Sequence, residues 1–155
     1  MKSRQRTMHY IQQIEGTLQQ IFPLLCPNRE KDWLDGWSYD MIYSKSGFAE
    51  ANCVFSTSIH GRETTFWMVS RYEPDQGIIE FVRLTPKEMV VKISIRVHQE
   101  NKGITPVEVT YIYTALAEEQ EKYLKQQLAE DFRKSMEWWE KAMNYYLRTG
   151  EMLGR

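Results

Sequence analysis

Apolar and polar residues alternate along several short stretches of the chain, and a final long stretch follows a different period. The clearest alternation spans Glu88–Gln99, and its apolar positions are Val91, Ile93, Ile95 and Val97. A period of two is typical of a β-strand with one buried face and one solvated face. Weaker versions of this pattern predict six more strands, at Met8–Ile14, Trp37–Lys45, Asn52–Ser58, Thr64–Tyr72, Ile78–Leu84 and Thr105–Ala115.

The last stretch predicts one long amphipathic helix, Glu118–Thr149, closed by Gly150. At about 1.5 Å per residue this helix would be about 48 Å long. Because its apolar stripe needs a partner, the helix is expected to cross the whole sheet. The stripe, at spacings of three and four, consists of Leu124, Leu128, Phe132, Met136, Trp139, Met143, Tyr146 and Leu147.

Two short helices are predicted after the first strand. Thr17 is a suitable N-cap for a helix over Leu18–Leu25, and Asn28 for a second helix over Arg29–Leu34. Glu30 lies near the start of the second helix, where the helix dipole favours an anion.

These elements predict an α+β fold. Short turns join the seven strands into an antiparallel meander, and a sheet with one dry face needs a cover. The C-terminal helix is the only element large enough to provide it. We therefore expect a single domain over residues 1–155, with a curved sheet wrapped round this helix and a ligand cavity between them.

The order of elements resembles that of the START-like, or SRPBCC, superfamily of helix-grip proteins. Nearly the whole chain takes part, and four strings are similar to those of one bacterial subgroup of small members. They are FPLLCPNREKDWLDGW at 22–37, TFWMVSRYEP at 65–74, FVRLTP at 81–86 and VTYIYTAL at 109–116. The resemblance implies a cavity, with the Trp33–Trp37 segment at its mouth.

One position departs from that family pattern. Such members often begin the last helix with a small hydroxyl residue followed by a glycine, where this chain has Ala117 and Gln120. The superfamily includes polyketide cyclases, lipid carriers and Hsp90-activator-like proteins, so the resemblance does not transfer a reaction.

The charge and composition of the chain limit the classes of partner that we expect it to bind. The net charge of −1 gives no electrostatic reason to expect nucleic acid, and no apolar run is long enough to span a membrane. The basic start of the chain is not followed by the apolar run of a secretory signal. We therefore expect a cytoplasmic protein, with Cys26 and Cys53 reduced and Cys53 buried in a strand.

No motif for catalysis or for a cofactor is present. His9, His60 and His98 lie in no metal-ligand spacing, and the chain has no GxSxG, Walker or GxGxxG string. We expect no metal and no cofactor. His9 is the exception among the histidines, because the resemblance places the first strand along the cavity.

Two arginines alternate with apolar residues on predicted strands. Arg83 shares a strand face with Ile79 and Phe81, and Arg71 shares one with Trp67. A guanidinium in an apolar pocket requires an anionic partner from the protein or from a ligand. Each arginine is therefore a candidate anchor for a ligand anion, unless it lies near a strand end and reaches water.

Aromatic side chains make up 13% of the residues and are candidates for the cavity wall. Tyr111 and Tyr113 would make polar contacts there, because a buried hydroxyl needs a partner. The candidate ligand-binding residues are His9, Trp37, Tyr39, Tyr43, Phe55, Trp67, Arg71, Phe81, Arg83, Tyr111, Tyr113, Phe132, Met136 and Trp139.

Three functions remain open from the sequence. The first is binding of a hydrophobic or aromatic small molecule, either lipid or polyketide-like. The second is a cyclase or dehydrase-like enzyme that uses the same pocket without a metal or nucleotide. The third is a protein-interaction module with a filled cavity. Trp138 is turned away from the helix stripe, so we expect it either to pack against the sheet edge or to form part of a homodimer contact.

Overall fold

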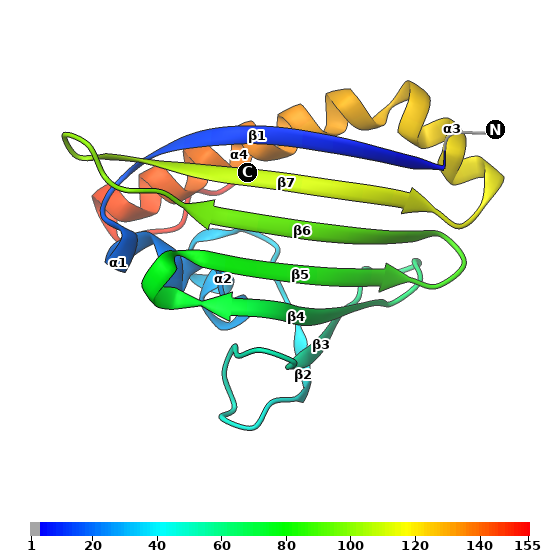
Figure 1. Cartoon of the computed structure of the whole chain (residues 1–155), viewed down its shortest axis with the longest axis horizontal. Coiled ribbons are helices and arrows are strands. Elements are labelled where there is room, and N and C mark those ends of the chain that lie inside the picture. Colours follow the sequence, from blue (N-terminus) through cyan, green and yellow to red (C-terminus); the bar gives the residue numbers. More distant parts are fainter. Residues whose placement is uncertain (1–3) are drawn as a thin grey trace.

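The computed structural model describes residues 4–155. A seven-stranded antiparallel sheet forms the body of the molecule, in the order β1-β7-β6-β5-β4-β3-β2 (Figure 1). The strands are β1 Gln5–Glu15, β2 Asp40–Tyr43, β3 Val54–Thr57, β4 Thr65–Glu73, β5 Ile78–Thr85, β6 Met89–Val97 and β7 Ile104–Ala115. The predicted α+β helix-grip arrangement is therefore confirmed.

Helical segments follow β1, join β4 to β5, and end the chain. They are α1 Leu18–Ile21, η1 Phe22–Leu25, α2 Pro27–Trp33, η2 Pro74–Gln76, α3 Glu118–Gln126 and α4 Leu128–Thr149. Thr17 caps α1 as predicted, in a reciprocal pair with the Gln20 side chain. The helix α2 begins two residues earlier than predicted, because Pro27 occupies its first position and Cys26 precedes it as N-cap.

The helix α4 lies along β1, the edge strand of the sheet (Figure 1). Gln13 N–H donates to the Glu140 carboxylate over 2.5 Å, and Glu15 N–H donates to Asn144 Oδ1 over 2.8 Å. Asn144 in turn donates to the Gln13 carbonyl over 3.0 Å. Side chains of α4 thus occupy backbone groups that an edge strand would otherwise expose.

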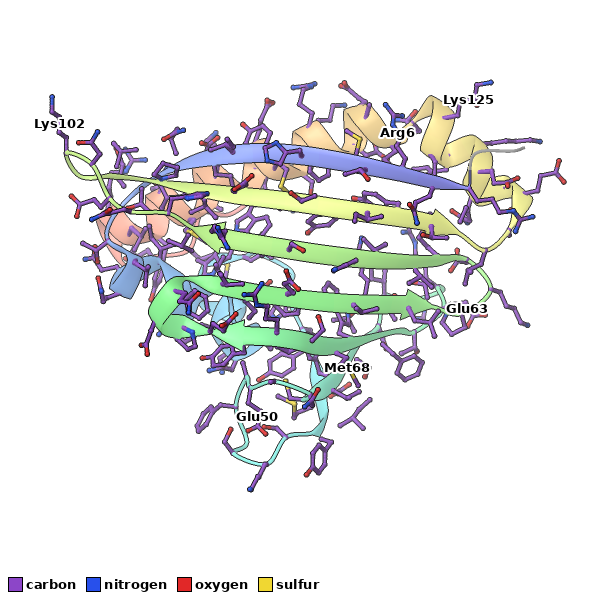
Figure 2. The ribbon with its side chains drawn as sticks, viewed as in Figure 1. Arg6, Glu50, Glu63, Met68, Lys102 and Lys125 are labelled. Carbon is purple, nitrogen blue, oxygen red and sulfur yellow. The ribbon has the colours of Figure 1, made fainter. Side chains whose placement is uncertain are left out.

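The C-terminal helix bends at Gln127, whereas the sequence predicted one uninterrupted helix. Gln127 has φ −125° and ψ −26°, outside the helical region. Arg6 donates to the Leu124 carbonyl over 2.7 Å, where the bend occurs (Figure 2). Tyr123 Oη donates to Asp131 Oδ2 over 2.7 Å and so connects the two sides. A side chain bonded to the backbone ladder is an established cause of such kinks.

The first predicted strand after the short helices is much shorter than expected. Residues 37–45 contain only β2, Asp40–Tyr43. The polar stretch that follows is folded around the Glu50 carboxylate, which accepts from Ser46 N–H over 2.7 Å and Lys45 N–H over 3.0 Å. These local hydrogen bonds replace ladder hydrogen bonds, which is how polar turn residues compete with strand formation.

The core lies between the inner face of the sheet and α4. The alternation of 88–99 is confirmed, since Val91, Ile93, Ile95 and Val97 are all buried. The helix stripe faces them, and its fully or nearly fully buried members include Leu128, Phe132, Met136 and Met143. Cys26 and Cys53 are free and buried.

Candidate functional site

A cavity of about 490 Å³ lies between the inner face of the sheet, α4 and the segment that follows α2. This volume is within the range of small-molecule sites, roughly 300–1,000 Å³. We call it the main cavity. Most of its wall is apolar or aromatic, and its polar groups include Glu30 and Arg83.

The aromatic wall is a set of rings in mutual contact. Phe55 and Trp67 are stacked with centroids 5.5 Å apart, and Phe81 meets both rings edge-on at 6.5 and 6.0 Å. Trp37 meets Trp67 edge-on at 6.0 Å. Stacked and edge-to-face contacts of this kind hold rings in fixed positions. The aromatic part of the wall is thus a set of rings that hold one another in place.

Strand register explains why these side chains face the same way. Directly opposed residues form one row across the sheet, in the order Phe55, Trp67, Arg83, Val91 and Tyr113. Residues directly opposite on antiparallel strands project from the same face. From β3 to β7 the sheet therefore places one arginine in the middle of a row of apolar and aromatic side chains.

Arg83 is held in the row by ring faces. Its guanidinium carbon lies 5.2 Å from the Trp67 centroid and 5.7 Å from the Tyr111 centroid. No carboxylate within residues 4–155 forms an ion pair with it. Cation–π contacts compensate only part of the cost of removing a guanidinium from water. The donor edge of Arg83 is therefore available to an anionic group in the cavity.

A second hollow of about 360 Å³ adjoins the main cavity on the side of α3, and we call it the side chamber. Arg83, Tyr111 and Met136 line both spaces. Tyr113 and Tyr123 line the side chamber alone. Arg83 consequently lies at the boundary between the two spaces, within reach of either.

The tyrosines beside Arg83 are neutral phenols at ordinary pH. Burial raises the pKa of Tyr111 and of Tyr113, and burial together with a hydrogen bond to Asp131 raises the pKa of Tyr123 to about 12. The positive charge of Arg83 acts in the opposite direction on all three, without reversing the shift. They can donate hydrogen bonds, but they do not supply negative charge.

Glu30 enters the main cavity from α2. Glu30 is partly buried and lines the cavity, and desolvation of its carboxyl by the surrounding protein raises the pKa of that group well above its usual range. No hydrogen bond or ion pair holds the Glu30 carboxyl among the described residues. The cavity thus contains a carboxyl group whose neutral form is favoured.

The helix α2 is fixed by two tryptophans on either side of its C-terminal end. Trp33 is fully buried, stacks on Trp139 at 6.0 Å and donates to the Leu24 carbonyl over 2.8 Å. Trp37 lines the cavity and donates to the Pro27 carbonyl over 2.8 Å. Glu30 is therefore mounted on an anchored segment.

Residues of α4 and Arg155 at the end of the chain border one side of the main cavity. Arg155 N–H donates to Asp35 over 3.2 Å, and its guanidinium lies 5.1 Å from the Trp138 ring centroid. The indole nitrogens of Trp138 and Trp139 are buried without a hydrogen-bond partner among residues 4–155. Each such donor lowers the free energy of unfolding by about 1–3 kcal/mol. The two indole groups therefore reduce the stability of the folded protein at this side of the cavity.

The structure brings most of the residues predicted from the sequence to these two spaces. The main cavity takes Trp37, Phe55, Trp67, Phe81, Arg83, Tyr111, Met136 and Trp139. The side chamber adds Tyr113 and Phe132. Tyr39 lies behind the wall, where it stacks on Trp37 at 6.3 Å.

His9 lies outside both spaces, contrary to the prediction. Its side chain is 47% exposed on the outer face of β1, and Nε2 lies 2.9 Å from Glu108 Oε2. His98 Nε2 lies 2.8 Å from the other oxygen of Glu108. The hydrogen bond from His9 is the largest cause that lowers the pKa of the Glu108 carboxyl, and the hydrogen bond from His98 is the second. No cluster within residues 4–155 could hold a metal ion.

Arg71 also lies outside, because β4 contains a bulge. The register with β5 shifts between Val69 and Arg71, so the alternation of inward and outward residues is interrupted there. Arg71 consequently points outward and pairs with Glu73 and, at 3.9 Å, with Glu80. Tyr43 is 61% exposed at the edge strand β2 and does not line the cavity.

Glu30 was missed by the sequence reasoning, which assigned it to the helix dipole. The position of Glu30 relative to nearby apolar residues could have identified it. Glu30 lies three residues before Trp33 and four before Leu34, so the three share one side of a helix. An acidic residue on the side of a short helix that carries a tryptophan and a leucine is directed toward the interior.

The fold has relatives among solved structures. Norcoclaurine synthase from Thalictrum flavum has a TM-score of 0.69 and 12% identity, over 96% of this chain and 89% of its own. The Zhui aromatase/cyclase from Streptomyces sp. R1128 has a TM-score of 0.67 and 10% identity, over 96% and 99%. The hypothetical protein jhp0584 from Helicobacter pylori has a TM-score of 0.72 and 11% identity, over 91% and 87%.

At this identity the comparisons show the fold alone, which is the helix-grip fold. No family model matches the chain, and no curated protein matches it in sequence. The structural likeness is consistent with the START-like resemblance of the sequence. Within the described residues no helix is long and apolar enough to cross a membrane.

Proposed function

We propose that this protein binds a hydrophobic, aromatic small molecule in the main cavity, as a member of the START-like superfamily and of its small bacterial subgroup. The observation that carries this proposal is the wall formed by Phe55, Trp67 and Phe81 round a cavity of about 490 Å³, with Arg83 set into it. Such a wall offers a flat molecule ring contacts on a surface that needs little reordering.

The chemistry of the wall narrows the ligand class. A purely aliphatic ligand would leave the donor edge of Arg83 desolvated and unpaired, at a cost. An aromatic ligand with an oxygen-bearing group satisfies the rings and the guanidinium together. The name of the Zhui aromatase/cyclase, whose fold this chain shares, is in keeping with a ligand of that kind.

A second candidate is an enzyme of the cyclase or dehydrase kind, favoured by the location of Glu30. A carboxyl with a raised pKa in the same cavity as a cation is an arrangement that can move a proton on a bound substrate. We place it second, because the geometry identifies no substrate atom for Glu30 to act on.

The interaction-module candidate is less well supported. It requires a filled cavity, and the main cavity is open to a volume of about 490 Å³. Apolar side chains do gather on the outer face of β4 and β5, where Met68 pairs with Val82 and Phe66 pairs with Leu84 (Figure 2). A homodimer through such a surface and a cytoplasmic location both remain predictions.

Native mass spectrometry of the protein purified from cells tests the binding proposal. An aromatic metabolite at near-unit occupancy, released on denaturation, would support it. Titration with a fluorescent naphthalene sulfonate dye is the second measurement, with Ser135→Trp as the blocking variant, because Ser135 lines both spaces and is exposed. Lys141→Trp, at an exposed site on the same helix, is the matched control. Equal dye affinity in both variants would contradict binding in the cavity.

A further inference from the structure

Two polar side chains enter the main cavity from different elements, Arg83 from β5 and Glu30 from α2. They do not form an ion pair, and neither has a hydrogen-bond partner among the residues that the structure describes. Both side chains are partly buried at the cavity, and a polar group that is partly removed from water is stabilised when it gains a hydrogen-bond partner. Two unpartnered groups of complementary chemistry in one cavity therefore indicate contacts that a ligand supplies.

We propose that Arg83 and Glu30 form a two-point site for an aromatic carboxylate that carries a second oxygen, with Arg83 binding the carboxylate and the Glu30 carboxyl contacting the other oxygen by a hydrogen bond. This inference rests on the proposed function and adds the ligand class and the two residues that select it.

Arg83 is suited to the carboxylate because of how it is held. The guanidinium carbon lies over the rings of Trp67 and Tyr111, 5.2 and 5.7 Å from their centroids, and no hydrogen bond within residues 4–155 occupies its N–H groups. Its N–H groups project from the edge of the plane and form a fork that matches a carboxylate. Arg83 is also central in the inward row of the sheet, so a ligand that contacts it lies against the aromatic wall.

Glu30 is suited to the second oxygen because of its enclosure. Removal from water favours the neutral carboxyl, which has one O–H donor. On its own helix Arg29 is paired with Asp32 at 2.8 Å, so that cation is already engaged. The ionisable groups that face the same space from other elements are Arg83 of β5, Tyr111 of β7, Asp35 before β2 and Arg155 at the chain end. The residues of α4 at the cavity, Ser135, Met136, Trp138 and Trp139, carry no ionisable group.

This arrangement makes binding depend on pH. While Glu30 is neutral, it donates to the ligand and adds no negative charge to a cavity that receives an anion. Once Glu30 ionises, the hydrogen bond is lost and a like charge is introduced. The affinity for an aromatic carboxylate should therefore fall as pH rises through the raised pKa of Glu30.

The test uses three naphthalene probes of nearly equal shape, measured by calorimetry with the full chain. The probe 6-methoxy-2-naphthoate has both oxygen functions, 2-naphthoate lacks the second oxygen, and 2-acetyl-6-methoxynaphthalene replaces the carboxylate by a neutral group. At about pH 5 we expect the first probe to bind about tenfold more tightly than either of the others. Arg83→Met should remove the preference for carboxylate over acetyl.

Glu30→Gln distinguishes the acid from a merely polar side chain. Glutamine keeps the size and a donor but does not ionise, so the variant should bind 6-methoxy-2-naphthoate equally well at about pH 5 and about pH 9. The native protein should lose about tenfold in affinity over the same range. The neutral acetyl probe, which carries no charge, should show a smaller pH dependence.

The outcomes separate the two proposals. If the probes bind with equal affinity, and Arg83→Met and Glu30→Gln change nothing, the two-point site is wrong while cavity binding stands. If 6-methoxy-2-naphthoate binds tightly but with the same pH dependence in Glu30→Gln, Glu30 is not the donor and the inference fails. If none of the three probes binds, and the dye affinity is unaffected by Ser135→Trp, the proposed function fails as well.

Discussion

The guanidinium carbon of Arg83 lies 5.2 Å from the ring centroid of Trp67, its directly opposed neighbour on β4. An arginine in an inward row would normally be matched by a carboxylate, and here an aromatic face takes that place. The contact holds the cation at the cavity without neutralising it.

Arg83→Met should therefore have a small effect on the stability of the ligand-free protein. The lost cation–π contacts are worth about 0.5–1 kcal/mol, and the gain from no longer desolvating a charge offsets part of this. Urea unfolding should give a free energy of unfolding within about 1 kcal/mol of the native value. A loss of more than about 3 kcal/mol would indicate that Arg83 is an essential part of the core.

Glu30→Gln should change how stability depends on pH. Because the folded pKa is raised, the folded state binds more protons than the unfolded state between the two pKa values, and stability falls as pH rises through that window. Each unit of the shift is worth about 1.4 kcal/mol. Unfolding curves should converge near pH 4 (about the unfolded pKa of Glu), with the variant more stable in alkaline solution. Parallel profiles would contradict an enclosed, unpartnered carboxyl.

Gly77→Ala should be strongly destabilising. Gly77 has φ +71°, and a Cβ there would lie 2.5 Å from the Val97 carbonyl oxygen. Gly103 is the matched control, because it has φ +84° with open space around it. We expect a loss of about 1 kcal/mol for Gly103→Ala from backbone strain alone and about 3 kcal/mol or more for Gly77→Ala. Equal losses in thermal or urea unfolding would show that the contact relaxes without cost.

Glu50→Gln should loosen the segment between β2 and β3. Hydrogen bonds from the side chain and the backbone of Ser46, with those from Lys45 N–H and Ser44, lower the pKa of Glu50 to about 2. The depressed pKa means that this contribution is present above the ordinary pKa of a glutamate and is lost as pH falls toward about 2. The amide protection factors of Lys45 and Ser46, which correct the exchange rate for its intrinsic dependence on pH, should fall several-fold in the variant and at low pH. Glu63→Gln, outside this segment, is the control (Figure 2).

Most of the fold could be predicted from the period of the hydrophobic residues. The alternation of Glu88–Gln99 and the stripe of Glu118–Thr149 correspond to buried faces, because burial on one side of a sheet or helix imposes that period. The bulge at Val69–Arg71 could not be read in the same way. An extra residue within a strand does not change the pattern of residue types in a recognisable way. The sequence therefore predicted that Arg71 faces inward with Trp67, whereas it faces outward.

The candidate site was partly predictable for a related reason. Aromatic residues on inward strand positions were found because alternation places them, whereas Glu30 needed the orientation of a short helix relative to the sheet. His9 followed from an expectation about the first strand, and its actual face is decided by the pairing of β1 with β7. The pattern of residues along a strand or helix predicts which side chains share a face. Which part of the protein that face packs against is known only from the folded structure.

The tryptophans of this chain are unevenly distributed in space. Of the five, Trp37, Trp67, Trp138 and Trp139 line the main cavity, and Trp33 stacks directly on Trp139. The intrinsic ultraviolet emission of the protein therefore originates almost entirely at the place where a guest would reside. Binding and release of an aromatic guest would therefore change the fluorescence of the unlabelled protein.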